Sequence, residues 1–163
     1  LMIKEPGYRL NVGLIILNDK GKLLLCKRKN VNSWQFPQGG IDSGETPYKA
    51  AKRELFEEVG IKANSVSLLG SINDWVKYEI PKKSRRNRFL KKKIIGQKQK
   101  WYMFKLKKDV IISFDNDPDN EFEEFKWVSY WYPLHVIIKF KESVYREVLN
   151  ELRLIYCKEV LND

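Results

Sequence analysis

Residues Gly39–Ile61 read GGIDSGETPYKAAKRELFEEVGI, a glycine-rich loop that runs into a strongly charged segment. The segment predicts a helix over Pro47–Val59, because proline suits the first helical position. Thr46 can cap the start of this helix with its hydroxyl, and Gly60 suits the turn that follows its end. We therefore expect a loop, a helix and a second loop in this part of the chain.

Three carboxylates of the predicted helix, those of Glu54, Glu57 and Glu58, recur at i, i+3 and i+4 and so share one side of it. They adjoin the apolar stripe that contains Leu55, which places them at the edge of the core. Like charges at these spacings repel, and a hard divalent cation such as Mg²⁺, which prefers oxygen ligands, would relieve the repulsion. Taken alone, the carboxylates favour a solvated acidic helix face, because Glu-rich helices are common.

The spacing of residues over the whole stretch Gly39–Ile61 favours a cation site over a solvated helix face. The chain has Gly39, then Glu45 after five residues, and then the run from Arg53 to Ile61 after seven more. This pattern resembles the Nudix box, G-x5-E-x7-R-E-U-x-E-E-x-G-U, where U is aliphatic. Seven single-residue positions and two aliphatic positions agree with it.

Other stretches of the chain resemble bacterial RNA pyrophosphohydrolases, which older naming calls dinucleoside polyphosphate hydrolases. They are YRLNVG (Tyr8–Gly13), SWQFPQGGI (Ser33–Ile41), GQKQKW (Gly96–Trp101) and WVSYWYP (Trp127–Pro133) followed by Phe140-Lys141. The resemblance covers most of the chain, from about Tyr8 to the C-terminal helix.

The resemblance implies an α/β fold, the α/β/α sandwich with a mixed β-sheet, as a single domain over residues 1–163. The implied activity is metal-dependent hydrolysis that removes pyrophosphate from the 5′-triphosphate end of RNA. The product would be 5′-monophosphate RNA, so the reaction would promote mRNA decay. The implied cofactor is Mg²⁺ or another divalent cation such as Mn²⁺.

The resemblance also implies roles for individual residues. Metal ligands would be Glu54, Glu57, Glu58 and Glu121, with a backbone carbonyl near Gly39. Arg53 would orient the carboxylates through a salt bridge, and the general base would be Glu54, Glu57 or Glu121. Glu121 also lies in the acidic stretch Asp115–Glu124, which is equally typical of a solvated loop.

Substrate recognition would come from residues outside the box, namely Arg9, Arg28, Gln97, Lys98, Phe140 and Lys141. The two arginines match family positions near the 5′-terminal nucleotide, although surface charge at strand ends explains them as well. Strand alternation separates Gln97 and Gln99 from Lys98 and Lys100, and either pair could face the substrate. Phe140 and Lys141 could stack on a base and contact a phosphate, or anchor local packing.

Three other functions stay open at this stage. The same site could hydrolyse dinucleoside polyphosphates of the diadenosine tetraphosphate type, or free nucleotides. A non-catalytic RNA-binding module is a third interpretation, but such a module is expected to have lost box carboxylates, and here all are present.

Composition favours a folded globular domain over a disordered or membrane-spanning protein. The chain has 163 residues, of which 43% are hydrophobic, enough for one domain with a core. No apolar run reaches transmembrane length, so we expect a cytoplasmic monomer without membrane contact. The net charge of +10 indicates a polyanionic partner or a lysine-rich composition. Lys82–Lys93 contributes eight basic residues and no acid, which predicts either a solvated mobile loop or an electrostatic arm for RNA.

The remaining pattern predicts a strand-rich chain with one long C-terminal helix over Ser143–Val160. Cys26 and Cys157 are too few and too far apart for a disulfide framework, and the apolar neighbours of Cys26 predict a buried thiol. Strands are expected over Tyr8–Asn18, Lys22–Arg28, Ser33–Phe36, Val66–Ile72, Val76–Ile80, Lys98–Leu106 and Phe125–Ser129.

Overall fold

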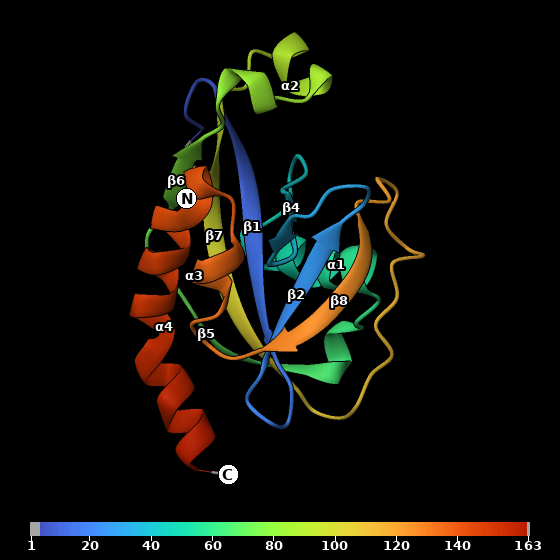
Figure 1. The fold of residues 1–163 in the computed structure, drawn as a ribbon, viewed down its shortest axis with the longest axis vertical. Coiled ribbons are helices and arrows are strands. Elements are labelled where there is room, and N and C mark those ends of the chain that lie inside the picture. Colours follow the sequence, from blue (N-terminus) through green and yellow to red (C-terminus); the bar gives the residue numbers. More distant parts are fainter. Residues whose placement is uncertain (1–3, 163) are drawn as a thin grey trace.

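The computed structural model describes residues 4–162. Within that range eight strands form one mixed sheet with helices on both faces (Figure 1). The strands are β1 (Tyr8–Leu17), β2 (Leu23–Arg28), β3 (Trp34–Gln35), β4 (Gln38–Gly40), β5 (Val66–Ser71), β6 (Val76–Glu79), β7 (Gly96–Leu106) and β8 (Phe122–Val128). The helices are α1 (Pro47–Val59), α2 (Asn87–Lys91), α3 (Pro133–Val136) and α4 (Glu142–Leu161), with 3₁₀ turns η1 (Ala63–Ser65), η2 (Lys82–Ser84) and η3 (Lys139–Lys141).

The parallel pair β1 and β7 forms the centre of the sheet. Its register runs from Tyr8 opposite Gly96 to Leu17 opposite Lys105. The other strand pairings of the described chain are antiparallel. The strand order is β3-β2-β1-β7-β5, with β4 on β1, β6 on β7 and β8 on β2. The predicted mixed sheet is confirmed.

Two hydrophobic clusters lie on opposite faces of β1, because successive side chains of a strand alternate between faces. Leu14 and Ile16 pack into the cluster that contains Leu55 of α1. Ile15 packs into the other cluster, which contains Tyr145 of α4. Helices α1 and α4 therefore cover opposite faces of the sheet, as in Figure 1, and the expected α/β/α sandwich is confirmed.

Helix α1 has the predicted bounds because its caps form as the sequence indicates. The Thr46 hydroxyl accepts a hydrogen bond from the Lys49 N–H at 3.2 Å. Gly60 adopts the left-handed conformation, with φ of 74°, and its N–H reaches carbonyls of the last turn. A non-glycine residue would be strained at that φ, so the helix has a defined end.

Several elements differ from the sequence expectation. β7 begins at Gly96 rather than Lys98, because its first residues pair with the start of β1. β8 begins at Phe122 rather than Phe125, through its pairing with Arg28. The short elements β4 and α3 were not predicted from the sequence pattern, since each has at most four residues.

The basic segment Lys82–Lys93, expected to be a loop, is partly helical, and most of its charged side chains are exposed. It forms η2 and α2, and the ring of Phe89 is only 5% exposed. The buried Phe89 ring attaches the segment to the body of the protein, and the charged side chains around it remain at the surface.

The two cysteines are free, with Cys26 buried as predicted and Cys157 exposed. Burial raises the pKa of the Cys26 thiol, which keeps it protonated and unreactive. Of the helices formed by residues 4–162, none combines the length and apolar character needed to cross a membrane.

Candidate active site

One pocket brings together the carboxylates of α1 and five basic residues from outside the box. Its acidic side chains come from α1 and from the loop before β8, and its basic ones from β1, β2, η3 and the segment around α2. The acidic side chains, called the acidic wall below, are Glu54, Glu57, Glu58, Asp117, Asp119 and Glu121. The basic side chains are Arg9, Arg28, Arg86, Arg88 and Lys141, and together with Gln97 and Phe140 they are called the basic wall.

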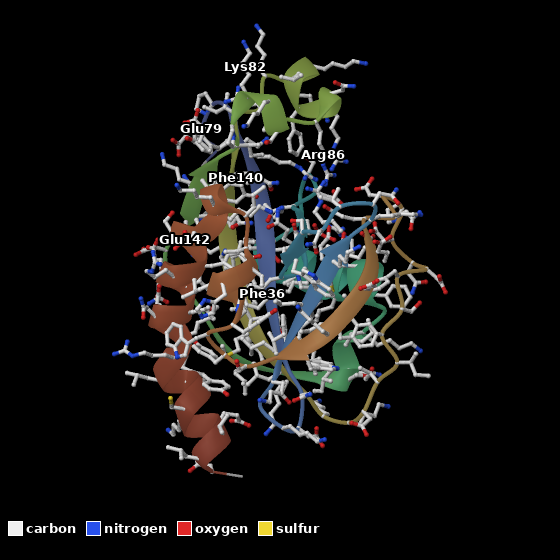
Figure 2. All side chains as sticks on the ribbon, in the orientation of Figure 1. Phe36, Glu79, Lys82, Arg86, Phe140 and Glu142 are labelled. Atoms are coloured by element: carbon white, nitrogen blue, oxygen red, sulfur yellow. The ribbon has the colours of Figure 1, made fainter. Side chains whose placement is uncertain are left out.

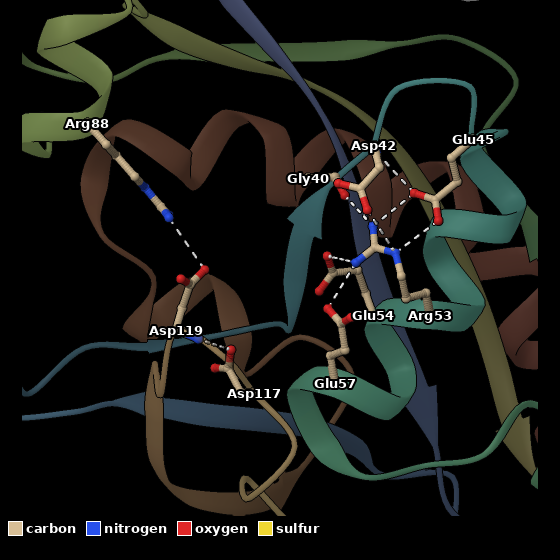
Figure 3. A network of polar contacts seen from close by, with 9 residues as sticks. All are labelled: Gly40, Asp42, Glu45, Arg53, Glu54, Glu57, Arg88, Asp117 and Asp119. Carbon is tan, nitrogen blue, oxygen red and sulfur yellow. Dashed lines mark hydrogen bonds and ion pairs between the residues drawn. The ribbon is translucent and has the colours of Figure 1, made fainter.

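Arg53 is the centre of a hydrogen-bond network behind the acidic wall (Figure 3). Its Nη1 donates to Glu54 Oε1 at 2.8 Å and to Glu57 Oε2 at 2.9 Å. Its Nη2 and Nε both donate to the Glu45 carboxylate at 2.9 Å, and Nη2 also reaches the Gly40 carbonyl at 2.8 Å. One guanidinium therefore ties the box loop to the helix and fixes two of its carboxylates.

The Arg53 network also explains why the box requires Glu45. Hydrogen bonds from Arg53 lower the pKa of the Glu45 carboxyl, which keeps it ionised. Glu45 Oε1 additionally accepts the Asp42 N–H at 3.0 Å, so the same carboxylate shapes the loop. Arg53 lies behind the pocket rather than on its surface, in agreement with an orienting role.

Glu54 is held between Arg53 and the backbone of β4. A Cβ added at Gly39 would lie 1.9 Å from Glu54 Cδ, so only glycine leaves room for this carboxylate. The Glu54 side chain is nearly buried, and burial raises its pKa to about 7. Gly39 thus acts here by leaving space for a predicted metal ligand.

Glu58 has an ionisable oxygen with no partner. The residue is 4% exposed, and Oε2 makes no hydrogen bond to any residue that the structure describes. Burial, together with the charges of Glu121, Asp117, Glu54 and Asp119, raises the pKa of Glu58 to about 10. A buried, unpaired carboxylate oxygen beside other carboxylates is suited to a cation.

Glu121 joins this acidic wall from the loop before β8. The Asp117 carboxylate accepts the N–H groups of Asp119 and Glu121, each at 2.8 Å, and so fixes the loop. Glu121 Oε1 accepts a hydrogen bond from Arg86 Nη2 at 2.6 Å and lies 3.8 Å from Arg28 Nε. The side chain therefore faces the pocket rather than open solvent.

The acidic wall fits a hard divalent cation in its chemistry, because its donors are carboxylate oxygens. In residues 4–162, no three acidic, histidine or cysteine side chains are gathered around one point. The carboxylates are instead bonded to arginines, Glu54 and Glu57 to Arg53 and Glu121 to Arg86.

The basic wall contains five of the six residues predicted for substrate recognition. Arg9 packs against β4, since a Cβ added at Gly40 would lie 2.1 Å from its Nη2. Lys141 is buried, which lowers the pKa of its ammonium to about 8, and its Nζ lies 3.4 Å from Gln35 Oε1. The Phe140 ring packs on Tyr78 at 5.9 Å between centroids. Arg28 and Gln97 complete this group.

A chain of buried amides supports the basic wall. Gln99 Nε2 donates to Asn11 Oδ1 at 2.7 Å and to Gln38 Oε1 at 3.2 Å, and Gln38 Nε2 donates to the Tyr78 hydroxyl at 3.2 Å. Gln97 Oε1 is buried without a partner among residues 4–162, and its side chain lines the pocket. The pocket thus presents an unpaired acceptor on each wall, from Gln97 and from Glu58.

The structure does not bring Lys98 to the pocket. Strand alternation places it on the opposite face of β7 from Gln97, and its Nζ lies 3.5 Å from Glu5 Oε2. Of the two pairs that alternation left open, the glutamines lie on the side of the site: Gln97 lines the pocket, and Gln99 is buried behind it.

Sequence reasoning missed four charged residues that line the pocket, Arg86, Arg88, Asp117 and Asp119. The arginines belong to the basic segment that the sequence singled out, but their acidic partners lie 31 and 35 residues away along the chain. Only the fold shows that these charges meet.

Comparison with known proteins agrees with this architecture. The NUDIX domain family matches residues 7–152. A protein of Tolumonas auensis named RNA pyrophosphohydrolase is 45% identical over 157 residues, which cover 94% of this chain and 89% of that protein. One of the same name from Francisella philomiragia is 43% identical over 162 residues, covering 99% and 100%.

Solved structures share the fold at lower identity. The E. coli dihydroneopterin triphosphate pyrophosphohydrolase superposes with a TM-score of 0.70 at 22% identity, covering 88% of this chain and 98% of that one. A C. elegans Ap4A hydrolase binary complex gives 0.62 at 19% identity, covering 85% and 93%. At these identities the likeness concerns the fold.

A helix that carries acids into a pocket with a basic opposite wall is typical of enzymes that cleave between phosphate groups, and this protein is an enzyme of that class. The family match and the close relatives identify it further: the chain belongs to the Nudix family. Hydrolases of this family use divalent metal ions.

Proposed function

We propose that this enzyme removes pyrophosphate from the 5′-triphosphate end of RNA, leaves a 5′-monophosphate and so promotes mRNA decay. The observation that carries the proposal is the single pocket in which the box carboxylates face Arg9, Arg28 and Lys141. A polyphosphate end needs both walls, one to hold cations and one to hold anionic oxygens and the nucleotide. The names of the relatives at 43–45% identity support RNA as the substrate.

The acidic wall would hold the metal through Glu54, Glu57, Glu58 and Glu121. Its all-oxygen character favours Mg²⁺ or Mn²⁺ over softer ions. When bound, such ions neutralise phosphate charge and make a water molecule more acidic. Arg53 keeps Glu54 and Glu57 oriented while this happens, and Gly39 leaves the space that Glu54 occupies.

The basic wall would bind and orient the RNA end. Arg9 and Arg28 offer guanidinium groups to phosphate oxygens, and Lys141 offers an ammonium at the back of the pocket. The unpaired Oε1 of Gln97 would accept a hydrogen bond from a hydroxyl or amino group of the nucleotide. Glu54, Glu57 and Glu121 are the candidate bases, since all three face the pocket and a carboxylate can accept a proton from water.

We infer that residues 1–163 form a single Nudix domain that acts as a monomer. One sheet joins all the strands of residues 4–162, and hydrophobic clusters cover both of its faces. Sedimentation equilibrium would test the monomeric state.

The direct test is incubation of the protein with Mg²⁺ and RNA labelled at its 5′-γ-phosphate. The label should be released as pyrophosphate, and Glu57→Gln should abolish the release. The matched control is Glu147→Gln, which removes an exposed carboxylate from α4 and should leave the rate unchanged. No release by the wild-type protein would overturn the proposal.

The competing substrate class is the dinucleoside polyphosphates, whose phosphate chain would use the same two walls. The ratio of kcat/KM for triphosphorylated RNA and for diadenosine tetraphosphate measures the preference. We expect RNA to be preferred, and a ratio in favour of the dinucleotide would assign the pocket to that class.

A further inference from the structure

The segment around α2 leans over the pocket and is attached to the body of the protein. The ring of Phe89 is buried, and the Phe89 carbonyl accepts the Ile94 N–H at 2.8 Å. In Figure 1 the segment forms a lobe at the top of the molecule, beyond β6 and the start of β1, and Figure 2 shows Arg86 at the lower side of this lobe.

Two ion pairs join this lobe to the acidic loop before β8. Arg86 Nη2 lies 2.6 Å from Glu121 Oε1, with the side chains 35% and 15% exposed. Arg88 Nη1 lies 3.4 Å from Asp119 Oδ2 in a more exposed pair, which Figure 3 shows. The Arg86 pair is the shorter and the more buried of the two, and it involves a proposed metal ligand.

Glu121 therefore has two competing roles. One of its oxygens is bonded to a guanidinium, and the same carboxylate belongs to the acidic wall beside Glu58. A divalent cation on that wall would attract the Glu121 oxygens more strongly than a single positive charge does, and it would repel the guanidinium. A displaced Arg86 would then need another anion.

An incoming polyphosphate supplies that anion. Phosphate oxygens match the planar, fixed donors of a guanidinium, which can bind two of them at once. Arg86 already lines the pocket, so its side chain needs only to exchange partners within it.

We propose that Arg86 is a substrate-binding residue whose guanidinium rests on Glu121 in the metal-free protein and moves to a phosphate of the substrate when a divalent cation occupies that carboxylate. This inference rests on the proposed function for its substrate, but the exchange on Glu121 does not depend on RNA. An arginine that only fastened the lobe could still repel the cation, but its removal would leave the KM for the substrate unchanged.

The test compares Arg86→Gln with Arg146→Gln, a matched control that removes a guanidinium paired with Glu142 at 2.7 Å on α4. Calorimetric titration of the RNA-free proteins with Mg²⁺ should show tighter binding to R86Q than to the wild type, by about threefold to tenfold, because the competing cation is gone. R146Q should bind Mg²⁺ as the wild type does. Unchanged Mg²⁺ affinity in R86Q would overturn the exchange.

The second measurement uses triphosphorylated RNA at saturating Mg²⁺. R86Q should raise KM about tenfold or more, the size expected from loss of one charge-assisted hydrogen bond, with a smaller change in kcat. Arg86→Lys should recover part of the loss, since it keeps the charge without the planar fork. An unchanged KM in R86Q would overturn the phosphate contact.

The Mg²⁺ titration and the RNA kinetics distinguish a failure of the proposed function from a failure of the role proposed for Arg86. If the wild-type protein releases no pyrophosphate from RNA, the proposed function is wrong, and the Mg²⁺ titration still decides whether Arg86 competes for Glu121. If R86Q does not fold, R86K takes its place in the titration, where a weaker Glu121 pair should again give tighter Mg²⁺ binding.

Discussion

A single side chain, that of Arg53, shows how much of the site is built from neighbours in sequence. It bonds Glu45 eight residues before it, Glu54 beside it and Glu57 one turn later. Because these partners are local, the spacing of the box predicts the network. Arg86 and Glu121 are 35 residues apart and meet only through the packing of the lobe, so the spacing gives no sign of them.

Gly39→Ala should inactivate the enzyme without unfolding it. The new Cβ would lie 1.9 Å from Glu54 Cδ, so the carboxylate must move away from its position beside Arg53. A displacement of this kind costs roughly 100-fold in rate. We expect that loss in kcat/KM with a nearly unchanged melting temperature.

The control for Gly39→Ala is Ser43→Ala, in the exposed part of the same loop. It should leave both quantities unchanged. A fully active Gly39→Ala protein would contradict the space-filling role of this glycine.

Glu58→Gln should stabilise the metal-free protein while it weakens cation binding. Burial raises the pKa of Glu58 from its ordinary 4.5 to about 10, so the folded chain holds a proton that the unfolded chain releases above pH 4.5. The free energy of unfolding therefore decreases as the pH rises from about 4.5 towards 10, and glutamine removes this dependence. At pH 8 in EDTA, E58Q should be more stable by on the order of 1–3 kcal/mol.

Thermal unfolding from pH 4 to pH 8 checks this prediction, with Glu147→Gln as the control. The difference in melting temperature between E58Q and the wild type should vanish near pH 4, where the side chain at this position is uncharged in both proteins. Saturating Mg²⁺ should narrow the difference at pH 8, because it stabilises only the protein that binds it well. Equal melting temperatures at pH 8 in EDTA would argue against a buried, protonated Glu58.

At the scale of elements, the quality of prediction follows the strength of local signals. Helix α1 has a cap at each end, and its bounds agree with the sequence. The basic segment has neither apolar periodicity nor a side-chain cap. Helix α2 forms there because the Phe89 ring is buried against the body of the protein. The first residues of β7 are set by the parallel partner β1, which no local pattern indicates.

Thr46→Ala should lower the free energy of unfolding by about 1 kcal/mol, because the Lys49 N–H loses its acceptor. Thr46→Ser keeps a hydroxyl and should lose much less. Urea denaturation of the three proteins measures both effects, and activity at 25 °C should persist in each. Equal destabilisation by alanine and serine would show that the methyl group, rather than the cap, matters at this position.

At the scale of the whole molecule, charge is unevenly distributed. The box holds five acidic and three basic residues, so the rest of the chain carries more than the entire net charge of +10. The acidic wall of the pocket attracts cations, and its basic wall together with the basic body attracts a polyanion. The composition indicated a polyanionic partner, and the structure adds the place where the two signs meet.

Binding of triphosphorylated RNA should weaken steeply with salt. Each phosphate neutralised by the protein adds about 0.7 to the slope of log affinity against log salt for a single strand. The slope should increase with RNA length from two to about six nucleotides, since longer strands reach more of the basic surface. Fluorescence anisotropy measured at a series of KCl concentrations from about 50 to about 300 mM gives the slope. A slope independent of length would confine RNA contacts to the terminal nucleotide.

The two thiols have very different access to solvent, and this has a practical consequence. Cys26 is buried with a raised pKa, whereas Cys157 lies exposed on α4. Along that helix Cys157 is about 24 Å from Lys141 at the pocket, at 1.5 Å per residue. A maleimide dye or a surface linker should therefore attach at one known point without mutagenesis, and single tethered molecules would keep their pockets open to the solution.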